Sequence, residues 1–336
     1  MRPNTVGVIV NPKAGQGAAQ NLRAAARLAK ALDAQTLLTG PGVLGADALP
    51  SARILPIPPL SGREASQALA AAALAAGVDA LAVIGGDGTL SDVAFVIHES
   101  GARCPILGIG AGSINAGDLI ACQSAQIDAL READFRVESV SALEAGCNDK
   151  ALALAFNDVV IGTTIVGTVG TEFADLDANA FLKGQRILGE PRPIGIDSAR
   201  VVKRRPSGDL PVASGRNVGT VIVGFAHYES FFGKAIIGGV CLSALMGAPA
   251  GCLVCEQALV RTHLAPGEYQ SMEPLHSSYV SLGDDGLIEI SGLDFPAVLC
   301  ADGNPLVALH PADHAQIRVR RGAVDVLRIA GERSVP

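Results

Sequence analysis

Residues 81–92 read Leu-Ala-Val-Ile-Gly-Gly-Asp-Gly-Thr-Leu-Ser-Asp, and they predict a buried strand that passes through a glycine turn into a helix. The apolar run 81–84 is the strand, residues 85–89 are the turn, and helical character continues over 90–99. Glycines let the backbone approach an anion closely, and a helix start adds N–H groups and the positive end of a dipole. The turn therefore suits a phosphate group.

The carboxylate of Asp87 is the unusual part of this turn. A carboxylate repels a phosphate, so its presence here makes sense only if it binds a cation or accepts a proton. An acid placed among phosphate-binding glycines indicates phosphoryl transfer more than passive phosphate binding. The alternative is an ordinary tight turn, in which Asp-Gly is common. The strand before the turn and Thr89 after it favour the functional interpretation.

Two further glycine loops follow strand-like runs. After the run 6–10, residues 11–17 read Asn-Pro-Lys-Ala-Gly-Gln-Gly, and an alanine-rich helix is expected from 18 to about 32. After the run 105–107, residues 108–115 read Gly-Ile-Gly-Ala-Gly-Ser-Ile-Asn. Open α/β sheets bind ligands where strands end and helices start, and Lys13 at such a place suits phosphate charge. Neither a dinucleotide fingerprint nor a Gly-Lys-Ser/Thr loop is present.

With Asn11-Pro12-Lys13 upstream, the Gly-Gly-Asp-Gly-Thr turn resembles the superfamily of NAD kinases, diacylglycerol kinases and sphingosine kinases, whose relatives include the phosphofructokinases. The resemblance implies that the glycines cradle nucleotide phosphates and that Asp87 is catalytic, acting near a metal and the acceptor hydroxyl. The residues expected to bind phosphate or nucleotide are Asn11, Lys13, Gly15, Gly17, Gly85, Gly86, Gly88, Thr89, Gly110, Gly112, Ser113 and Asn115.

Two later segments extend the resemblance. Residues 155–160, Ala-Phe-Asn-Asp-Val-Val, look like the asparagine–acid pair with which NAD kinases contact their dinucleotide, with aspartate where glutamate is usual. Residues 301–304, Ala-Asp-Gly-Asn, look like the late Asp-Gly turn of the family. The resemblance assigns Asn157, Asp158 and Asp302 to the substrate. Taken alone, the first pair also fits a strand-end turn, and Asp-Gly-Asn also fits a hairpin turn.

The chain also departs from the NAD kinases. Their Thr-Gly-Ser-Thr-Ala segment has no clear counterpart; residues 161–167 read Ile-Gly-Thr-Thr-Ile-Val-Gly instead, and a glycine-rich stretch lies near 237–251. These features look more like the acetoin-catabolism protein X branch, which is NAD kinase-like.

The function expected from the resemblance is an ATP-dependent kinase that phosphorylates a hydroxyl of a small molecule, with NAD as the acceptor and Mg²⁺ bound through the ATP phosphates. Two alternatives stay open. One is a lipid or other small-alcohol kinase of the diacylglycerol kinase type, and the other is a nucleotide-binding protein of a catabolic pathway without turnover. Polyphosphate also stays open as the phosphoryl donor.

Strand and helix patterns alternate in the first part of the chain, which predicts a parallel, Rossmann-like sheet with helices on both faces. From about Phe135 onward, short strands separated by Gly, Asp and Pro predict a β-sandwich with one short helix around 173–188. We therefore expect an α/β nucleotide-binding domain at 1–135, a β-rich substrate domain at 136–315 and an unassigned segment at 316–336. This is the architecture that the NAD kinase resemblance implies.

The composition of the chain excludes some classes of binding partner. The chain has 336 residues, 49% of them hydrophobic, and a net charge of −7. An acidic chain argues against nucleic acid and against acidic membranes as partners, and glycines interrupt the uncharged run 235–255, which argues against membrane insertion. The seven scattered cysteines do not form a disulfide framework, and Cys252 and Cys255 are expected to be buried thiols. With no signal peptide before the first strand, we expect a cytoplasmic homo-oligomer that binds a nucleotide and a small molecule.

Overall fold

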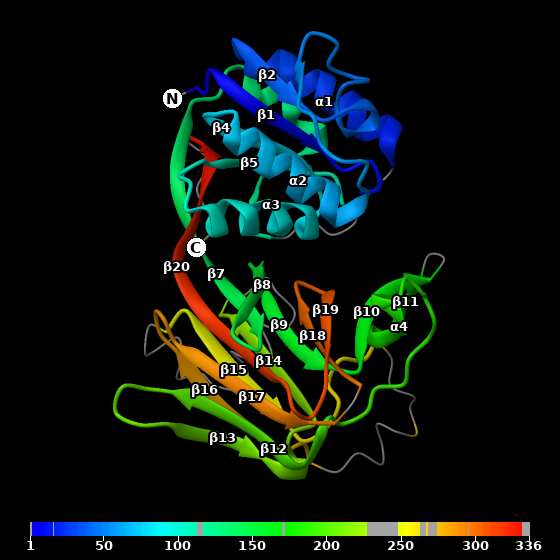
Figure 1. Ribbon diagram of the computed structural model, residues 1–336, viewed down its shortest axis with the longest axis vertical. Coiled ribbons are helices and arrows are strands. Elements are labelled where there is room, and N and C mark those ends of the chain that lie inside the picture. The colour runs from blue at the N-terminus through cyan, green and yellow to red at the C-terminus, as the bar shows by residue number, and fades with distance from the viewer. Residues whose placement is uncertain are drawn as a thin grey trace. The chain divides into compact units, whose positions relative to one another are not determined.

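The computed structural model describes residues 2–15, 17–112, 117–169, 172–226, 248–262, 267, 274–294 and 296–330 (Figure 1). The chain divides into two compact units, of which the first comprises residues 1–141 with 322–336 and the second residues 142–321. Strands β7 (Phe135–Cys147) and β20 (His314–Ile329) each pass from one unit into the other. The segment 316–336, which the sequence left unassigned, thus supplies most of β20.

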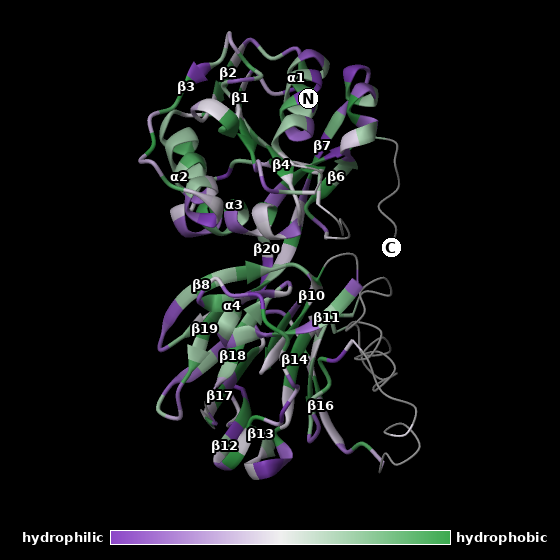
Figure 2. Ribbon diagram, turned by 90° about the vertical axis from the view of Figure 1, so that its right-hand side faces the viewer, coloured by the Kyte–Doolittle hydropathy of each residue, from purple (hydrophilic) through white to green (hydrophobic). Residues whose placement is uncertain are grey.

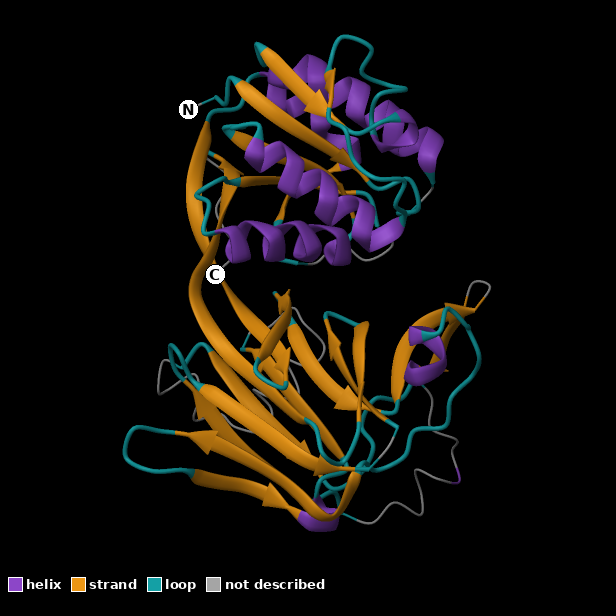
Figure 3. Cartoon of the chain, in the orientation of Figure 1, coloured by secondary structure: helices purple, strands orange, loops and turns teal. Residues whose placement is uncertain are grey.

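The first unit is built on a parallel sheet in the order β6-β5-β4-β1-β2-β3. Its strands are β1 (Thr5–Val10), β2 (Thr36–Thr39), β3 (Arg53–Ile54), β4 (Ala80–Gly85), β5 (Ile106–Gly110) and β6 (Ile120–Gln123). Its helices are α1 (Ala18–Leu32), α2 (Gly62–Ala75) and α3 (Asp87–Ser100), with short 3₁₀ helices η1 (Gly42–Leu44) and η2 (Ser124–Arg131). Figure 3 shows the long helices gathered in this unit.

The central strands are buried on both faces. Every residue of β4 is buried, and its alternate residues Ala80, Ala82 and Ile84 share one apolar cluster with α1 and η2. Leu28 on the apolar face of α1 is wholly buried in that cluster. A strand covered on both sides reads as a continuous apolar run, which is the pattern that the sequence shows. The predicted α/β architecture with a parallel sheet is confirmed.

The second unit consists of antiparallel sheets. One sheet has the order β16 (Ser277–Leu282), β15 (Ala250–Cys255), β14 (Thr220–Phe225), β9 (Asp158–Gly162), β18 (Ala297–Ala301), β19 (Asn304–Leu309). The other has the order β13 (Leu210–Ser214), β12 (Gly195–Arg204), β17 (Leu287–Leu293), β20, β7, β8 (Lys150–Ala155). One core cluster contains buried side chains from both sheets, so they pack face to face and the predicted β-sandwich is confirmed.

The hydrophobic faces of these strands explain the packing. Figure 2 shows strands such as β14 and β18 in hydrophobic colours, and every residue of both strands is buried. Cys252 and Cys255 lie buried as free thiols in β15, as the sequence predicted. Of the glycine-rich stretch near 237–251 and the uncharged run 235–255, residues up to 247 lie outside the described part of the chain. Among the helices that are described, none has the length and apolarity needed to cross a membrane.

The helix predicted around 173–188 is largely wrong. Glu172–Asp177 forms strand β11, which pairs with β10 (Thr164–Val169), and only Ala178–Leu182 is helical (α4). Asp177 accepts a hydrogen bond from the Ala180 backbone N–H at 2.7 Å and so caps this short helix. Cross-strand pairing outweighs the helical propensity of Ala174 and Leu176.

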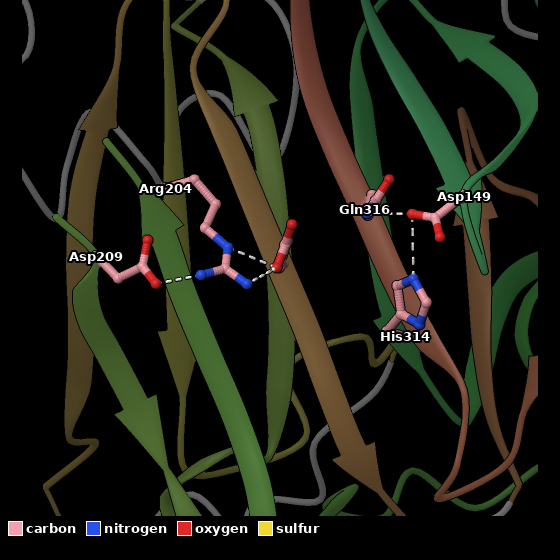
Figure 4. Close-up of polar contacts among 6 residues, drawn as sticks. Asp149, Arg204, Asp209, His314 and Gln316 are labelled. Atoms are coloured by element: carbon pink, nitrogen blue, oxygen red, sulfur yellow. Dashed lines mark hydrogen bonds and ion pairs between the residues drawn. The ribbon is translucent and has the colours of Figure 1, made fainter. Parts of the chain in front are cut away.

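Polar side chains also join the strands at the surface of the second unit (Figure 4). Arg204 of β12 donates from Nε to Glu289 of β17 at 2.6 Å and also pairs with Asp209. On the turn after β7, Asp149 accepts a bond from Gln316 Nε2 at 3.0 Å, and it lies 3.4 Å from Nε2 of His314. Such exposed pairs each contribute little, about 0–1 kcal/mol, so the apolar core determines the stability of this unit.

A single glycine tests the packing of the first sheet. A Cβ atom at Gly108 in β5 would lie 2.0 Å from the Leu119 carbonyl oxygen. Gly108→Ala is therefore expected to lower the free energy of unfolding by about 2–3 kcal/mol, the cost of overpacking a core. Gly162→Ala in β9 is the control, because nothing lies within 4 Å of its added Cβ. Equal losses in urea unfolding of the two variants would contradict the tight approach at Gly108.

Candidate functional site

Three loops of the first unit meet at one edge of its sheet. Parallel pairing aligns Val10 with Ile84 and Gly85 with Gly110, so β1, β4 and β5 end together. The Asn11 backbone N–H donates to the Ile84 carbonyl at 2.9 Å, and the Ala111 N–H donates to the Gly85 carbonyl at 2.8 Å. The structure therefore brings together the loop 11–17, the turn 85–89 and the start of the loop after Gly110. Ser113 and Asn115 lie outside the described residues.

Glycines allow this close approach. Gly15 has a φ of +52°, and a Cβ atom there would lie 1.8 Å from the Ala111 carbonyl oxygen. A Cβ at Gly86 would lie 3.3 Å from Cα of Gly112, and one at Gly85 would lie 2.7 Å from Cβ of Thr89. Larger residues at these positions would push the loops apart.

Two helices begin at these loops without a side-chain cap. Gly17 precedes α1 and Gly86 precedes α3, and glycine has no side chain with which to accept the first N–H groups of a helix. Gly88 lies in the first turn of α3. Backbone N–H groups and the positive ends of two helix dipoles therefore face the same edge, which favours a phosphate anion.

Asn11 joins the first two loops. Its Nδ2 donates to Oγ1 of Thr89 at 2.7 Å, and its Oδ1 accepts from the Lys13 backbone N–H at 2.9 Å. Thr89 is buried, whereas the Lys13 side chain is exposed. Both polar groups of Asn11 thus hold the loops in place, and Lys13 keeps its ammonium group accessible to a ligand.

Asn21 is a functional candidate that the sequence reasoning missed. It lies on the buried face of α1 with an exposed fraction of only 2%. Its Nδ2 donates to the carbonyls of Asn11 at 2.8 Å and Ala14 at 2.9 Å, so it fixes the loop from beneath. The sequence did carry a signal for this role. Asn21 lies at helical spacing from the apolar positions 24, 25 and 28, which places its amide on the buried face, and a buried amide needs hydrogen-bond partners.

Asp87 is the first residue of α3. Its Oδ1 accepts a hydrogen bond from the Gly117 backbone N–H at 3.1 Å, which links it to the far end of the third loop. The side chain is partly exposed, and the helix dipole stabilises negative charge at this end. A carboxylate so placed can accept a proton or meet a metal ion carried by phosphates.

The second unit brings the other candidates together. Asp302 directly follows β18 and begins the turn to β19, and its Oδ2 accepts from the Phe156 backbone N–H at 2.8 Å. Its Oδ1 accepts from the N–H groups of Asn157 at 2.8 Å and Asp158 at 3.1 Å. Burial, and then the neighbouring charge of Asp302, raise the pKa of Asp158 to about 7. Asp158 therefore changes its protonation state near neutral pH.

Within the described ranges, His, Cys, Asp and Glu side chains do not gather in groups of three or more suited to a metal ion. Mg²⁺ that arrives on nucleotide phosphates needs only one or two protein carboxylates. Asp87 beside the uncapped helix starts fits that requirement, because the N–H groups suit the phosphates and the carboxylate suits the cation.

A family model and a relative match the sequence of this chain. Residues 5–133 match the diacylglycerol kinase catalytic domain. An uncharacterized protein of Archaeoglobus fulgidus is 30% identical over 256 residues, covering 76% of each chain.

Solved structures share the fold. A protein of Bacillus anthracis strain Sterne assigned as a diacylglycerol kinase has a TM-score of 0.54 and 17% identity, over 99% of this chain and 100% of that one. Yeast NADH kinase in complex with NADH has a TM-score of 0.54 and 13% identity, over 98% of this chain and 84% of that one.

Removing the amide of Asn21 tests the loop geometry. Asn21→Ala leaves the carbonyls of Asn11 and Ala14 without this donor, so we expect ATP affinity to fall about tenfold, in line with roughly 1–2 kcal/mol for the lost bonds. Ser66→Ala is the control, because Ser66 is a buried helix residue that bonds only to Gly62 within α2. Calorimetry measures the ATP affinity of both variants. Equal ATP affinities of Asn21→Ala and Ser66→Ala would show that Asn21 does not support the site.

The raised pKa of Asp158 predicts a pH-dependent stability. The pKa rises from an ordinary 3.8 to about 7, so between these values the unfolded chain releases a proton that the folded chain keeps. Stability therefore falls as pH rises through this window, and the full loss is present above it. Asp158→Asn should be neutral near pH 4 and stabilising by about 1–3 kcal/mol near pH 8.

The exposed carboxylate of Asp285 provides the control for this effect, because it lies on the surface in a left-handed turn that asparagine also tolerates. Asp285→Asn should change the free energy of unfolding by a similar small amount at both pH values. Urea unfolding measures both variants. If the stabilisation by Asp158→Asn does not grow with pH, ionisation of Asp158 does not cost the folded state free energy.

Proposed function

Because the chain belongs to the superfamily of kinases that includes the diacylglycerol kinases and the NAD kinases, we propose that it transfers the γ-phosphoryl group of ATP to a hydroxyl of NAD. The observation that carries the donor side of this proposal is the meeting of three glycine loops and two uncapped helix starts around Asp87. Such an edge binds phosphates through backbone N–H groups.

In this proposal the acceptor hydroxyl oxygen forms a bond to the γ-phosphorus, and the bond from that phosphorus to the bridging oxygen of ADP breaks. Asp87 takes the hydroxyl proton. The glycine N–H groups and the Lys13 ammonium stabilise the phosphate charge that develops. When bound, Mg²⁺ would further neutralise the phosphate charge, and Asp87 is the carboxylate that would hold it.

The choice of NAD rests on the second unit. Asn157 and Asp158 resemble the asparagine–acid pair of NAD kinases, with aspartate where glutamate is usual, and the backbone N–H groups of both bond to Asp302. The fold of yeast NADH kinase is similar. We assign this cluster to the acceptor, with Asn157 and Asp158 as hydrogen-bonding groups.

A lipid or other small alcohol is the second candidate acceptor, favoured by the match to the diacylglycerol kinase catalytic domain. That match ends at residue 133, so it bears on the donor side and leaves the choice of acceptor to the second unit. A nucleotide-binding protein of a catabolic pathway, without turnover, is the third candidate. The proposal also takes the protein to be a cytoplasmic homo-oligomer, and light scattering of the purified chain tests the assembly.

One assay separates these candidates. The purified protein is incubated with ATP and Mg²⁺ and with NAD, NADH or diacylglycerol in turn, and ADP and phosphorylated product are measured by mass spectrometry. We expect NADP from NAD. Phosphatidic acid alone would assign a lipid kinase, and ATP binding without ADP formation in any mixture would assign a protein without turnover. Repeating the assay with polyphosphate identifies the donor.

Asp87→Asn tests the catalytic role. Asparagine has nearly the same shape but cannot act as a base at neutral pH, so kcat should fall roughly 10²–10⁴-fold, while ATP affinity in EDTA is retained. Glu99→Gln, at the exposed end of the same helix, is the matched control. If the Asn variant turns over as fast as the control with the native acceptor, Asp87 is not catalytic.

A further inference from the structure

The turn between β8 and β9 carries Asn157 and Asp158, and it is held from β18 by one carboxylate. We propose that Asp302 is a positioning residue, which fixes the backbone of residues 156–158 and thereby orients Asn157 and Asp158 toward the acceptor without contacting the acceptor itself. This inference rests on the proposed function, because it takes the Asn157–Asp158 pair to be the acceptor side.

The hydrogen bonds occupy both oxygens of the Asp302 carboxylate. Oδ2 accepts from Phe156 N at 2.8 Å, and Oδ1 accepts from Asn157 N at 2.8 Å and Asp158 N at 3.1 Å. Bonds from N–H groups to a carboxylate are roughly twice as strong as bonds between neutral groups. The Asp302 N–H in turn donates to the Asp158 carbonyl at 2.9 Å. Both oxygens of this carboxylate therefore bond to the protein backbone, which is what a positioning residue requires.

The backbone of Asp302 suits this task. Its φ is +45° and that of Gly303 is +74°, so the two residues form a left-handed turn between β18 and β19. Among residues with a side chain, aspartate and asparagine tolerate this region best. An aspartate is thus the residue that both permits the turn and supplies two acceptor oxygens.

The Asp302 carboxylate also affects the pKa of Asp158. From β18, Asp158 faces the Asp302 carboxylate and the buried thiol of Cys300, whose pKa is itself raised by burial and by the Asp158 charge. From β14, the residue paired with Asp158 is Gly224, which has no side chain. Removing the charge of Asp302 should therefore lower the pKa of Asp158.

Asp302→Asn isolates the positioning role. Asparagine tolerates the left-handed backbone, so the turn keeps its conformation, but one carboxylate oxygen becomes an NH₂ group that cannot accept a hydrogen bond. Asp313→Asn is the matched control. The Asp313 carboxylate also fixes a turn of the second unit, accepting from His310 N at 2.8 Å and Asn148 Nδ2 at 2.7 Å.

Three measurements are expected to change in Asp302→Asn but not in Asp313→Asn. Amide hydrogen exchange at residues 156–158 should accelerate at least about tenfold, because at least one bond is lost. The KM for NAD should rise about tenfold with the KM for ATP unchanged, and the acidic limb of kcat/KM for NAD should move to lower pH with the pKa of Asp158.

The outcomes separate this inference from the proposed function. Unchanged exchange at residues 156–158 overturns the positioning role whether or not the protein turns over. A raised KM for NAD with unchanged exchange also overturns it, since Asp302 would then contact the acceptor directly. Faster exchange with an unchanged KM for NAD shows that this turn does not serve the acceptor. Absence of phosphoryl transfer by the native protein overturns the proposed function alone, because the exchange measurement does not require activity.

Discussion

The parallel register of β1, β4 and β5 is the constraint on which the rest of the first unit depends. Because Val10 aligns with Ile84 and Gly85 with Gly110, the three strands end at one edge and their loops must meet there. Two backbone bonds, from Asn11 to Ile84 and from Ala111 to Gly85, then join the loops. Close packing at that edge leaves no space for a Cβ atom at Gly15. The ends of the strands thus determine where glycines are needed, where the helices begin and where Asp87 lies.

Two carboxylates with opposite surroundings divide the chemistry. Asp87 lies at a helix start, where the dipole stabilises negative charge. Asp158 is desolvated beside Asp302, and its pKa is raised to about 7. Near neutral pH, Asp158 can therefore either donate a hydrogen bond as an acid or accept one as a carboxylate. In the proposed function, these different environments suit Asp87 for accepting a proton and Asp158 for hydrogen bonding to the acceptor.

Local patterns in the sequence predicted much of this arrangement, and contacts between distant segments explain what they missed. The strand, glycine turn and helix around Asp87 were predictable because each is encoded by neighbouring residues, and the helix expected at 18–32 is observed at those bounds. Strand β11 was not predicted, because six residues are too few to separate strand from helix without the pairing partner β10. The bonds of Asp302 span 144 to 146 residues, and no local pattern reports them.

The polar residues of the site fall into those that build it and those that remain accessible. Asn21 and Asp302 bond to backbone groups, and Asn11 bonds to the Thr89 side chain and the Lys13 backbone. Lys13 is exposed, and Asp87, Asn157 and Asp158 are partly exposed, so a ligand can reach these four side chains. The first unit presents mainly backbone N–H groups, which recognise any phosphate, whereas the Asn157–Asp158 turn presents side chains, which can distinguish one alcohol from another. The acceptor should therefore be chosen by the second unit, and substitutions there should change which alcohol is phosphorylated before they change how ATP is bound.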